Sequence, residues 1–472
     1  MFDRFFSLHD NGTTIKTEVA SGITLFLTGM YILFVNGIVL SQTGMPPVGI
    51  FVATALTAAV CTLFIALYSN LPFMMAPGMG INSFFAFTIC LGSGYHWKEG
   101  LCITFMAGLV HVALMLTPYR KRLIIAIPEY LGAAAGAGLG LFIAFVGICD
   151  TGLVTLANSS TPAKSVLSSP IYVHSLLSSV DVSFIIPIIA AIILLFLLAV
   201  EQRTGEKYGA LPISILLTTF VCIPLSLDRF QTFISFTFSY AEDFQAVFLS
   251  FFGAPGLMTV FATPAIALKT ILIVVLLSLT NILDSLGTII GLGYLRRTIL
   301  FGEKERELFE KKGAASRIDK LLIANSFGGV ISGLFGSSTS VLYLESSAGV
   351  LLGGRTGLCA LTAAILFLLC IPIADIFRII PIEAVAPAMV YVGCCMMTRI
   401  RLVDWDRLEE AFPAFLILLL VPVTRTVLDG ICIGITAHLI INMTLGNREK
   451  LHPTLFVVSF TYITAKVIGL FL

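Results

Sequence analysis

The chain has 472 residues, of which 57% are hydrophobic and 12% charged, and its mean hydropathy is +1.00. Because soluble domains carry roughly a quarter charged residues, this composition excludes an ordinary soluble protein and indicates a polytopic membrane protein. The net charge of +1 gives no reason to expect nucleic acid or an acidic partner.

Apolar segments long enough to cross a membrane follow one another along the chain. The first comes after a polar, mixed-charge start and is too long for a signal-peptide core, so we expect it to stay in the mature protein as the first span. At about 20 apolar residues per span, we expect fourteen segments, at 18–40, 47–68, 71–93, 100–117, 130–149, 183–200, 209–226, 266–292, 319–335, 339–352, 356–374, 380–398, 411–427 and 428–446.

The basic residues predict how these segments are oriented. If the N-terminus is cytoplasmic, most of the 28 lysines and arginines fall in loops on that side, as expected for cytoplasmic loops. The mixed-charge connection 294–318 then lies inside and divides the chain into halves. Residues 453–472 are apolar enough to cross again or to lie along the interface.

Two of the fourteen segments are interrupted by small and polar residues, over 76–83 in the third and 336–345 in the tenth. Such breaks are sheltered only by protein or by a water-filled cavity. They occupy matching positions in the two halves, each of seven segments, which predicts a seven-plus-seven inverted repeat with short extended breaks. We expect the two breaks to meet near the bilayer midplane, where inverted-repeat transporters bind their substrates.

Ionisable residues inside apolar sequence are functional candidates because they are expensive to keep in a membrane. Glu345 follows the polar run that contains Thr339, and Asp284 lies one turn beyond Asn281 on the same helical face. Structural alternatives are an internal salt bridge or helix cap for Glu345, a brace for Asp284 and an interhelical amide for Asn281.

The third segment contributes further residues to the same candidate binding site. Pro77 stops the helix, and Gly80 permits a close approach that a Cβ would obstruct. A helix-dimerisation face would use small residues in the same way, but Pro77 together with Asn82 favours a pocket.

Five stretches of the sequence resemble the azaguanine-resistance purine permeases, the adenine/guanine/hypoxanthine branch near the nucleobase–ascorbate transporters. They are 18–46, 76–87, 281–291, 338–357 and 386–393, and the resemblance extends over nearly the whole chain. It implies an all-α membrane fold in which a core domain (1–125 and 265–378) carries substrate past a gate domain (126–264 and 379–472). It also implies import of adenine, guanine or hypoxanthine by proton symport, and it suggests a homodimer.

The resemblance places substrate binding on residues of three segments. These residues are Gly80, Asn82, Asn281, Asp284 and Glu345, to which we add Thr339 from the polar run before Glu345. A neutral purine carries ring N–H donors that a carboxylate can accept, while backbone N–H groups can donate to its lone pairs.

Glu345 and Asp284 are the predicted proton-coupling groups, because desolvation favours the protonated form of a carboxyl group. The chain departs from the family pattern at Asn281 and Asn325, where aspartate is usual, and at Asn36-Gly37, where Asn-Pro is usual. The first two departures remove two acidic proton carriers and leave the choice between proton and sodium open.

Other functions remain open from the sequence. An anion permease of the sulfate type can share this fold, although two acids at the site argue against an anionic ligand. A sensor that no longer couples to protons is a further alternative. The ten scattered cysteines show no metal-binding spacing, so we expect no cofactor, no metal and no enzymatic activity, in a multi-pass protein of the cell membrane.

Overall fold

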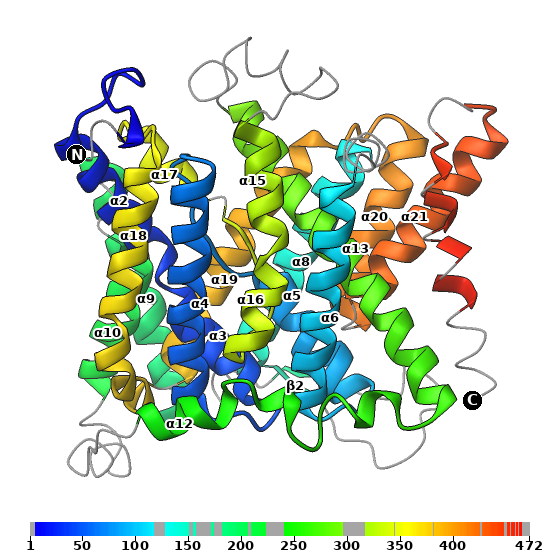
Figure 1. Ribbon diagram of the computed structural model, residues 1–472, viewed down its shortest axis with the longest axis horizontal. Coiled ribbons are helices and arrows are strands. Elements are labelled where there is room, and N and C mark those ends of the chain that lie inside the picture. Colours follow the sequence, from blue (N-terminus) through cyan, green and yellow to red (C-terminus); the bar gives the residue numbers. More distant parts are fainter. Residues whose placement is uncertain are drawn as a thin grey trace.

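A computed structural model shows a bundle of mostly upright helices (Figure 1). It describes residues 5–117, 128–150, 154–156, 171–173, 182–205, 209–222, 240–295, 317–343, 345–380, 382–424, 427–447, 451–453, 455–457, 459–460 and 462–464.

The elements before the charged connection include one π-helix, η1. They are α2 (Ile15–Gly29), α3 (Ile32–Ser41), α4 (Pro47–Tyr68), β1 (Met75–Pro77), α5 (Met79–Ser83), η1 (Phe84–Gly92), α6 (Trp97–Leu116), α8 (Glu129–Asp150), β2 (Val154–Leu156), β3 (Ile171–Val173), α9 (Val182–Thr204), α10 (Ala210–Cys222), α12 (Tyr240–Val247), η4 (Ser250–Phe252), η5 (Thr259–Phe261) and α13 (Pro264–Leu295).

The elements after it begin with a helix pair that leads into the second break. They are α15 (Arg317–Ser326), α16 (Gly328–Phe335), β4 (Ser340–Leu342), α17 (Ser346–Leu351), α18 (Gly357–Leu369), η6 (Ile371–Ile379), α19 (Ile382–Met397), η7 (Thr398–Leu402), α20 (Leu408–Thr424) and α21 (Val427–Thr444).

Seven helical stretches in the described part of the chain are long and apolar enough to cross a membrane. These stretches overlap the expected first, second, fourth, fifth, sixth, eighth and twelfth segments. Their lengths agree with the roughly 20 residues that a spanning helix needs. The count of fourteen crossings and the inverted repeat stay predictions.

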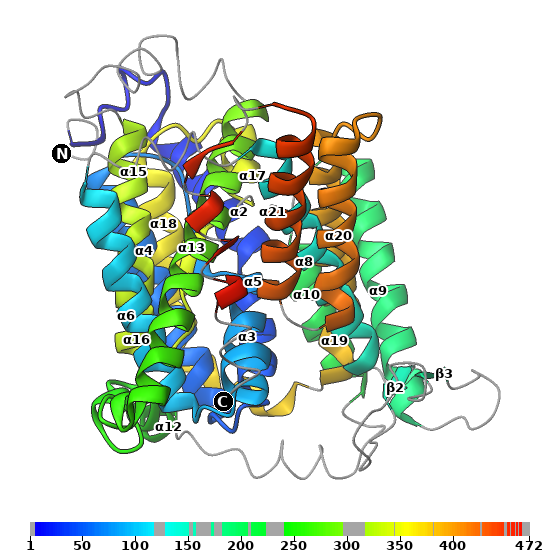
Figure 2. The same ribbon diagram turned by 90° about the vertical axis from the view of Figure 1, so that its right-hand side faces the viewer.

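The helices pack as two groups. The first helix group is α2–α6 with α15–α18, and the second helix group is α8–α10 with α19–α21; within each group the members contact one another extensively, while α13 contacts both α6 and α8. Figure 2 shows α4, α6 and α16 on one side and α9, α19 and α20 on the other. The sequence halves are therefore intermingled, since each group takes helices from both.

Each predicted break contains a short extended part, and the two extended parts pair with each other, while residues 79–83 of the first break form helix α5. β1 and β4 run antiparallel, with Met75 opposite Leu342 and Pro77 opposite Ser340. Helix α5, which follows β1, lies at mid-height of the bundle in both views (Figures 1 and 2). The expectation that the third and tenth segments meet is confirmed.

A second strand pair was not expected from the sequence. Val154–Leu156 and Ile171–Val173 form the antiparallel pair β2–β3 in the connection between α8 and α9. Both stretches contain the β-branched and aromatic residues that strands favour, but they are too short to be recognised within a long polar connection.

Candidate functional site

Backbone hydrogen bonds hold the two breaks together. The Gly78 N–H donates to the Thr339 carbonyl at 3.0 Å, and the Tyr343 N–H donates to the Met74 carbonyl at 3.1 Å. The Tyr343 hydroxyl donates to the Pro77 carbonyl at 2.6 Å. Backbone groups freed by the helix breaks thus find partners across the pair, as an apolar environment requires.

Neutral side chains surround this crossing. Ser338 Oγ donates to Asn82 Oδ1, and the Asn36 amide nitrogen donates to Thr54 Oγ1 at 2.6 Å and to Ser337 Oγ at 3.2 Å. All five side chains are buried. Because each polar group costs free energy when buried without a partner, these bonds fix the position of the broken segments relative to α3, α4 and α5.

Asn325 braces the crossing from a third direction. Its Oδ1 accepts the Leu342 N–H at 3.1 Å, beside the bond from the Ser340 N–H to Ser332 Oγ at 2.9 Å. An amide can accept this backbone bond as a carboxylate would. The asparagine at this family-aspartate position therefore has a structural partner on β4.

A cavity of about 400 Å³ lies between the two helix groups, next to the crossing. Glu345 contributes a carboxylate to its wall, and the buried Tyr31 hydroxyl donates to Glu345 Oε1 at 2.8 Å. The wall formed by the first helix group consists of Leu27, Thr28, Tyr31, Gly78, Met79, Gly80, Val341, Leu342, Tyr343, Glu345 and Ala348.

The opposite wall belongs to the second helix group. It consists of Leu198, Glu201, Gly209, Ala210, Leu211, Pro212, Tyr391, Val392, Cys395, Met396 and Thr398. Glu201 Oε1 accepts the Gly209 and Ala210 N–H groups at 2.8 and 2.9 Å, which ties the end of α9 to the start of α10. Since this wall is built from helix ends, the cavity runs from the crossing toward one end of the bundle.

Away from that end, the two groups are in close apolar contact. A Cβ on Gly80 would lie only 2.5 Å from Cδ1 of Leu139 in α8. The rings of Phe87 in η1 and Phe142 in α8 meet edge to face, with centroids 5.7 Å apart. Gly80 thus lets Leu139 of α8 pack directly against the backbone of α5, and it also lines the cavity.

The predicted site residues divide into two sets. Gly80 and Glu345 line the cavity, whereas Asn82, Thr339 and Asn281 are buried. Helix α13, which carries Asn281, contacts both β4 and α5.

Asp284 follows Asn281 one turn later in α13, and its side chain lies outside the described residues.

Sequence reasoning missed Tyr31, Glu201 and Cys395 as cavity residues. Tyr31 is separated from Glu345 by 314 positions, and no motif links them. Of the three, only Glu201 could have been noticed in the sequence, because it is an acid at the end of an apolar segment. An acid at that position is ordinarily interpreted as an interfacial residue.

The buried carboxylate of Glu18 lies apart from the cavity lining. It accepts the N–H groups of Arg355, Thr356 and Cys359 at 2.7, 3.3 and 3.1 Å, and the Thr356 hydroxyl at 2.9 Å. These donors surround the start of α18, where backbone N–H groups lack helical partners. Glu18 therefore joins α2 to α18 within the first helix group.

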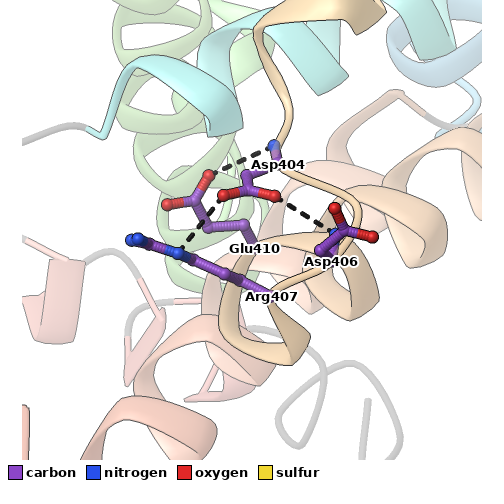
Figure 3. A network of polar contacts seen from close by, with 4 residues as sticks. All are labelled: Asp404, Asp406, Arg407 and Glu410. Carbon is purple, nitrogen blue, oxygen red and sulfur yellow. Dashed lines mark hydrogen bonds and ion pairs between the residues drawn. The ribbon is translucent and has the colours of Figure 1, made fainter.

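The entry to α20 carries an exposed polar network (Figure 3). Arg407 Nε lies 3.2 Å from Asp404 Oδ2, while Asp404 Oδ1 accepts the Asp406 N–H at 3.2 Å and Glu410 Oε2 accepts the Asp404 N–H at 3.4 Å. These bonds shape the turn between η7 and α20.

Comparison with solved structures shows the fold. The transmembrane domain of the cyanobacterial bicarbonate transporter BicA superposes with a TM-score of 0.60 at 18% identity, over 88% of this chain and 96% of that one. The structure of SLC26A9 superposes with a TM-score of 0.59 at 11% identity, over 91% of this chain and 66% of that one.

Comparison with sequences shows the family. Residues 16–433 match the model of the Permease family. The guanine/hypoxanthine permease PbuG of Bacillus subtilis is 32% identical over 97% of this chain and 98% of its own length. The adenine permease AdeP of Escherichia coli is 30% identical over 98% and 95%. The chain therefore belongs to the permease family, in the branch whose relatives are adenine and guanine/hypoxanthine permeases.

Proposed function

We propose that the protein is a secondary active transporter that imports a purine nucleobase, adenine, guanine or hypoxanthine. The observation that carries the proposal is the Glu345 carboxylate, which faces a cavity beside two paired helix breaks in a membrane protein of this family. Relatives that are full-length matches are permeases for these bases.

The chemistry of the cavity suits a flat, neutral heterocycle. A purine presents N–H donors along one edge, and the Glu345 carboxylate can accept one or two of them. The adjoining wall is largely apolar, with Met79, Val341 and Leu342 available to cover the faces of the ring. A few placed polar groups in an apolar pocket are typical of sites for small molecules.

The buried residues of the predicted site have supporting roles in this proposal. Asn82 Nδ2 and Thr339 Oγ1 are buried without a hydrogen-bond partner among the described residues. We assign them to the substrate's polar edge, reached directly or through water. Asn281 is assigned to the same region, and Asp284 joins Glu345 as a candidate carrier of the coupled proton.

Transport proceeds by alternating access in this proposal. The first helix group acts as the core domain that carries the base, and the second acts as the gate domain. The Gly80–Leu139 and Phe87–Phe142 contacts seal one side while the cavity leads to the other. With the N-terminus in the cytoplasm, this arrangement is the inward-facing state.

An anion permease is the competing proposal, because the structural neighbours are anion transporters. The described cavity lining includes Glu345 and Glu201 but neither lysine nor arginine. A site for an anion gains from positive charge, whereas two acids repel it. The lining therefore favours a neutral ligand with N–H donors.

Two adjacent cysteines allow a direct binding test. Cys395 lines the cavity and Cys394 does not, yet both are exposed. Alkylation by a maleimide is followed in purified Cys394→Ser and Cys395→Ser variants. With purine at about ten times its Kd, mass action slows alkylation of Cys395 about ten-fold and leaves Cys394 unchanged.

If none of the purines tested slows the alkylation of Cys395, the cavity is rejected as the purine site. Protection by bicarbonate or sulfate, with none by purines, would favour the anion permease.

Coupling is tested separately with Glu345→Gln. We expect this variant to lose accumulation of radiolabelled purine against its gradient, because the amide cannot load and release a proton. Uptake by the wild type should also collapse when a protonophore is added. Accumulation by Glu345→Gln at wild-type level would show that Glu345 is not the coupling group.

A further inference from the structure

Tyr31 lies where the first membrane segment is interrupted. Helix α2 ends at Gly29 and α3 starts at Ile32, so Tyr31 falls at the junction. The junction is tightly packed, since a Cβ on Gly29 would lie 2.0 Å from the terminal methyl carbon of Met74. Tyr31 is 2% exposed, and it lines the cavity.

The Tyr31 hydroxyl touches the carboxylate that the proposed function uses. It donates to Glu345 Oε1 at 2.8 Å, which is an ordinary distance for an O–H···O hydrogen bond. The neighbouring tyrosine in the cavity, Tyr343, donates instead to the Pro77 carbonyl. The two tyrosines on this wall thus have different partners, since Tyr343 bonds to backbone and Tyr31 bonds to the acid.

We propose that Tyr31 is a positioning residue for transport, whose hydroxyl orients the Glu345 carboxylate toward the substrate and sets how readily that carboxylate takes up a proton. The inference rests on the proposed role of Glu345. It adds a residue from the first segment to a site that the sequence assigned to the third, eighth and tenth.

The packing around Glu345 supports this choice of partner. The titratable groups that face the same cavity are Tyr31 and Tyr343 from the first helix group, and Glu201, Tyr391 and Cys395 from the second. Those of the second group lie across the cavity, on the wall that separates when the groups move. Tyr31 is on the same side as Glu345, so its bond can persist through the transport cycle.

The test removes the hydroxyl and keeps the ring. In Tyr31→Phe, we expect the KM for purine uptake to rise about five-fold, the loss expected for one hydrogen bond of about 1 kcal/mol. Because a donated hydrogen bond favours the ionised carboxylate, its removal should move the alkaline limb of the uptake–pH profile upward by about half to one pH unit.

Tyr462→Phe is the matched control. Its hydroxyl donates to Asp429 Oδ1 at 3.0 Å, which is the same chemistry away from the cavity lining. We expect wild-type KM and pH profile for this variant. Equal shifts in both variants would overturn the proposal, as would a Tyr31→Phe profile that coincides with wild type.

Incorporation of 3-fluorotyrosine at position 31 gives a variant that preserves packing. Its more acidic hydroxyl is a stronger donor, so the alkaline limb should move to lower pH, opposite to Tyr31→Phe. Movement in the same direction as Tyr31→Phe, or none, would contradict the proposal even if the phenylalanine variant folds poorly.

Binding data separate failure of this inference from failure of the proposed function. If purine does not protect Cys395 in the wild type, the proposed function fails. If purine does protect Cys395, Tyr31→Phe alone should weaken that protection. In a protein that already carries Glu345→Gln, Tyr31→Phe should cause no further loss of protection, because Tyr31 acts through Glu345. Additive losses in the double variant would assign Tyr31 a role independent of Glu345.

Discussion

Glu18 and Glu345 are both acids within apolar sequence, yet their surroundings differ. Glu18 is completely buried and accepts four hydrogen bonds from residues at the start of α18. Glu345 is partly exposed on a cavity wall, where its Oε1 accepts the bond from the Tyr31 hydroxyl. The first has its acceptor capacity filled by protein, while the second faces a space large enough for a ligand.

The difference shows that burial in a membrane segment does not by itself mark a functional acid. A carboxylate accepts about four hydrogen bonds, and Glu18 already has that number. Any exchange with a ligand there would first have to break bonds that hold α2 to α18. We therefore assign Glu18 to folding and Glu345 to transport, and Glu18→Gln tests the first assignment.

Glu18→Gln should have the largest effect on stability. The amide replaces one acceptor oxygen with an N–H donor, so at least one of the four donors, the Arg355 N–H, loses its acceptor. Each lost acceptor costs about 1–3 kcal/mol. We expect a marked loss of folded protein, measured by thermal unfolding in detergent. Lys16→Gln, an exposed position on the same helix, should unfold like wild type. A stable Glu18→Gln variant with impaired coupling would reverse our assignment.

Glu201→Ala should have an intermediate effect. It removes the acceptor of two backbone N–H groups at the start of α10, for which we expect about 2 kcal/mol of destabilisation. Glu201→Gln should keep most of the stability that Glu201→Ala loses, because an amide oxygen can accept the same two hydrogen bonds. If only the glutamate supports stability, charge rather than acceptor geometry is what the α9–α10 turn needs.

Arg407→Ala should have the smallest effect. Its contact with Asp404 is exposed, with side-chain accessibilities of 60% and 47%, and exposed pairs contribute about 0–1 kcal/mol. We expect unchanged uptake and an unfolding temperature close to wild type. A large loss of uptake in this variant would mean that the turn before α20 participates in transport.

The sequence predicted the parts of this architecture that leave a local signature. Breaks at 76–83 and 336–345 stood out because small and polar residues interrupt apolar runs, and their matching positions indicated that they meet. The likeness to purine permeases, carried by contiguous motifs, is confirmed by relatives that match over the full length.

What the sequence could not predict depends on contacts between distant segments. Nothing near Tyr31 indicates a bond to Glu345, and nothing near Glu18 indicates four donors from a loop more than 330 positions away. Gly80 illustrates the same limit. The sequence pattern indicated a substrate site at Gly80, but nothing in it indicated the contact with Leu139 of the other helix group.

The β1–β4 pair has a consequence for how a substrate would be bound from each side of the membrane. Because main-chain bonds join residues of both sequence halves, the alternating-access cycle proposed above would carry the two breaks as one piece, with the same contacts in either orientation. A difference in affinity between uptake and release must then originate in the facing wall of Glu201, Tyr391 and Cys395. In that proposed cycle, substitutions on this wall would change the rate of transport while leaving the choice of substrate intact.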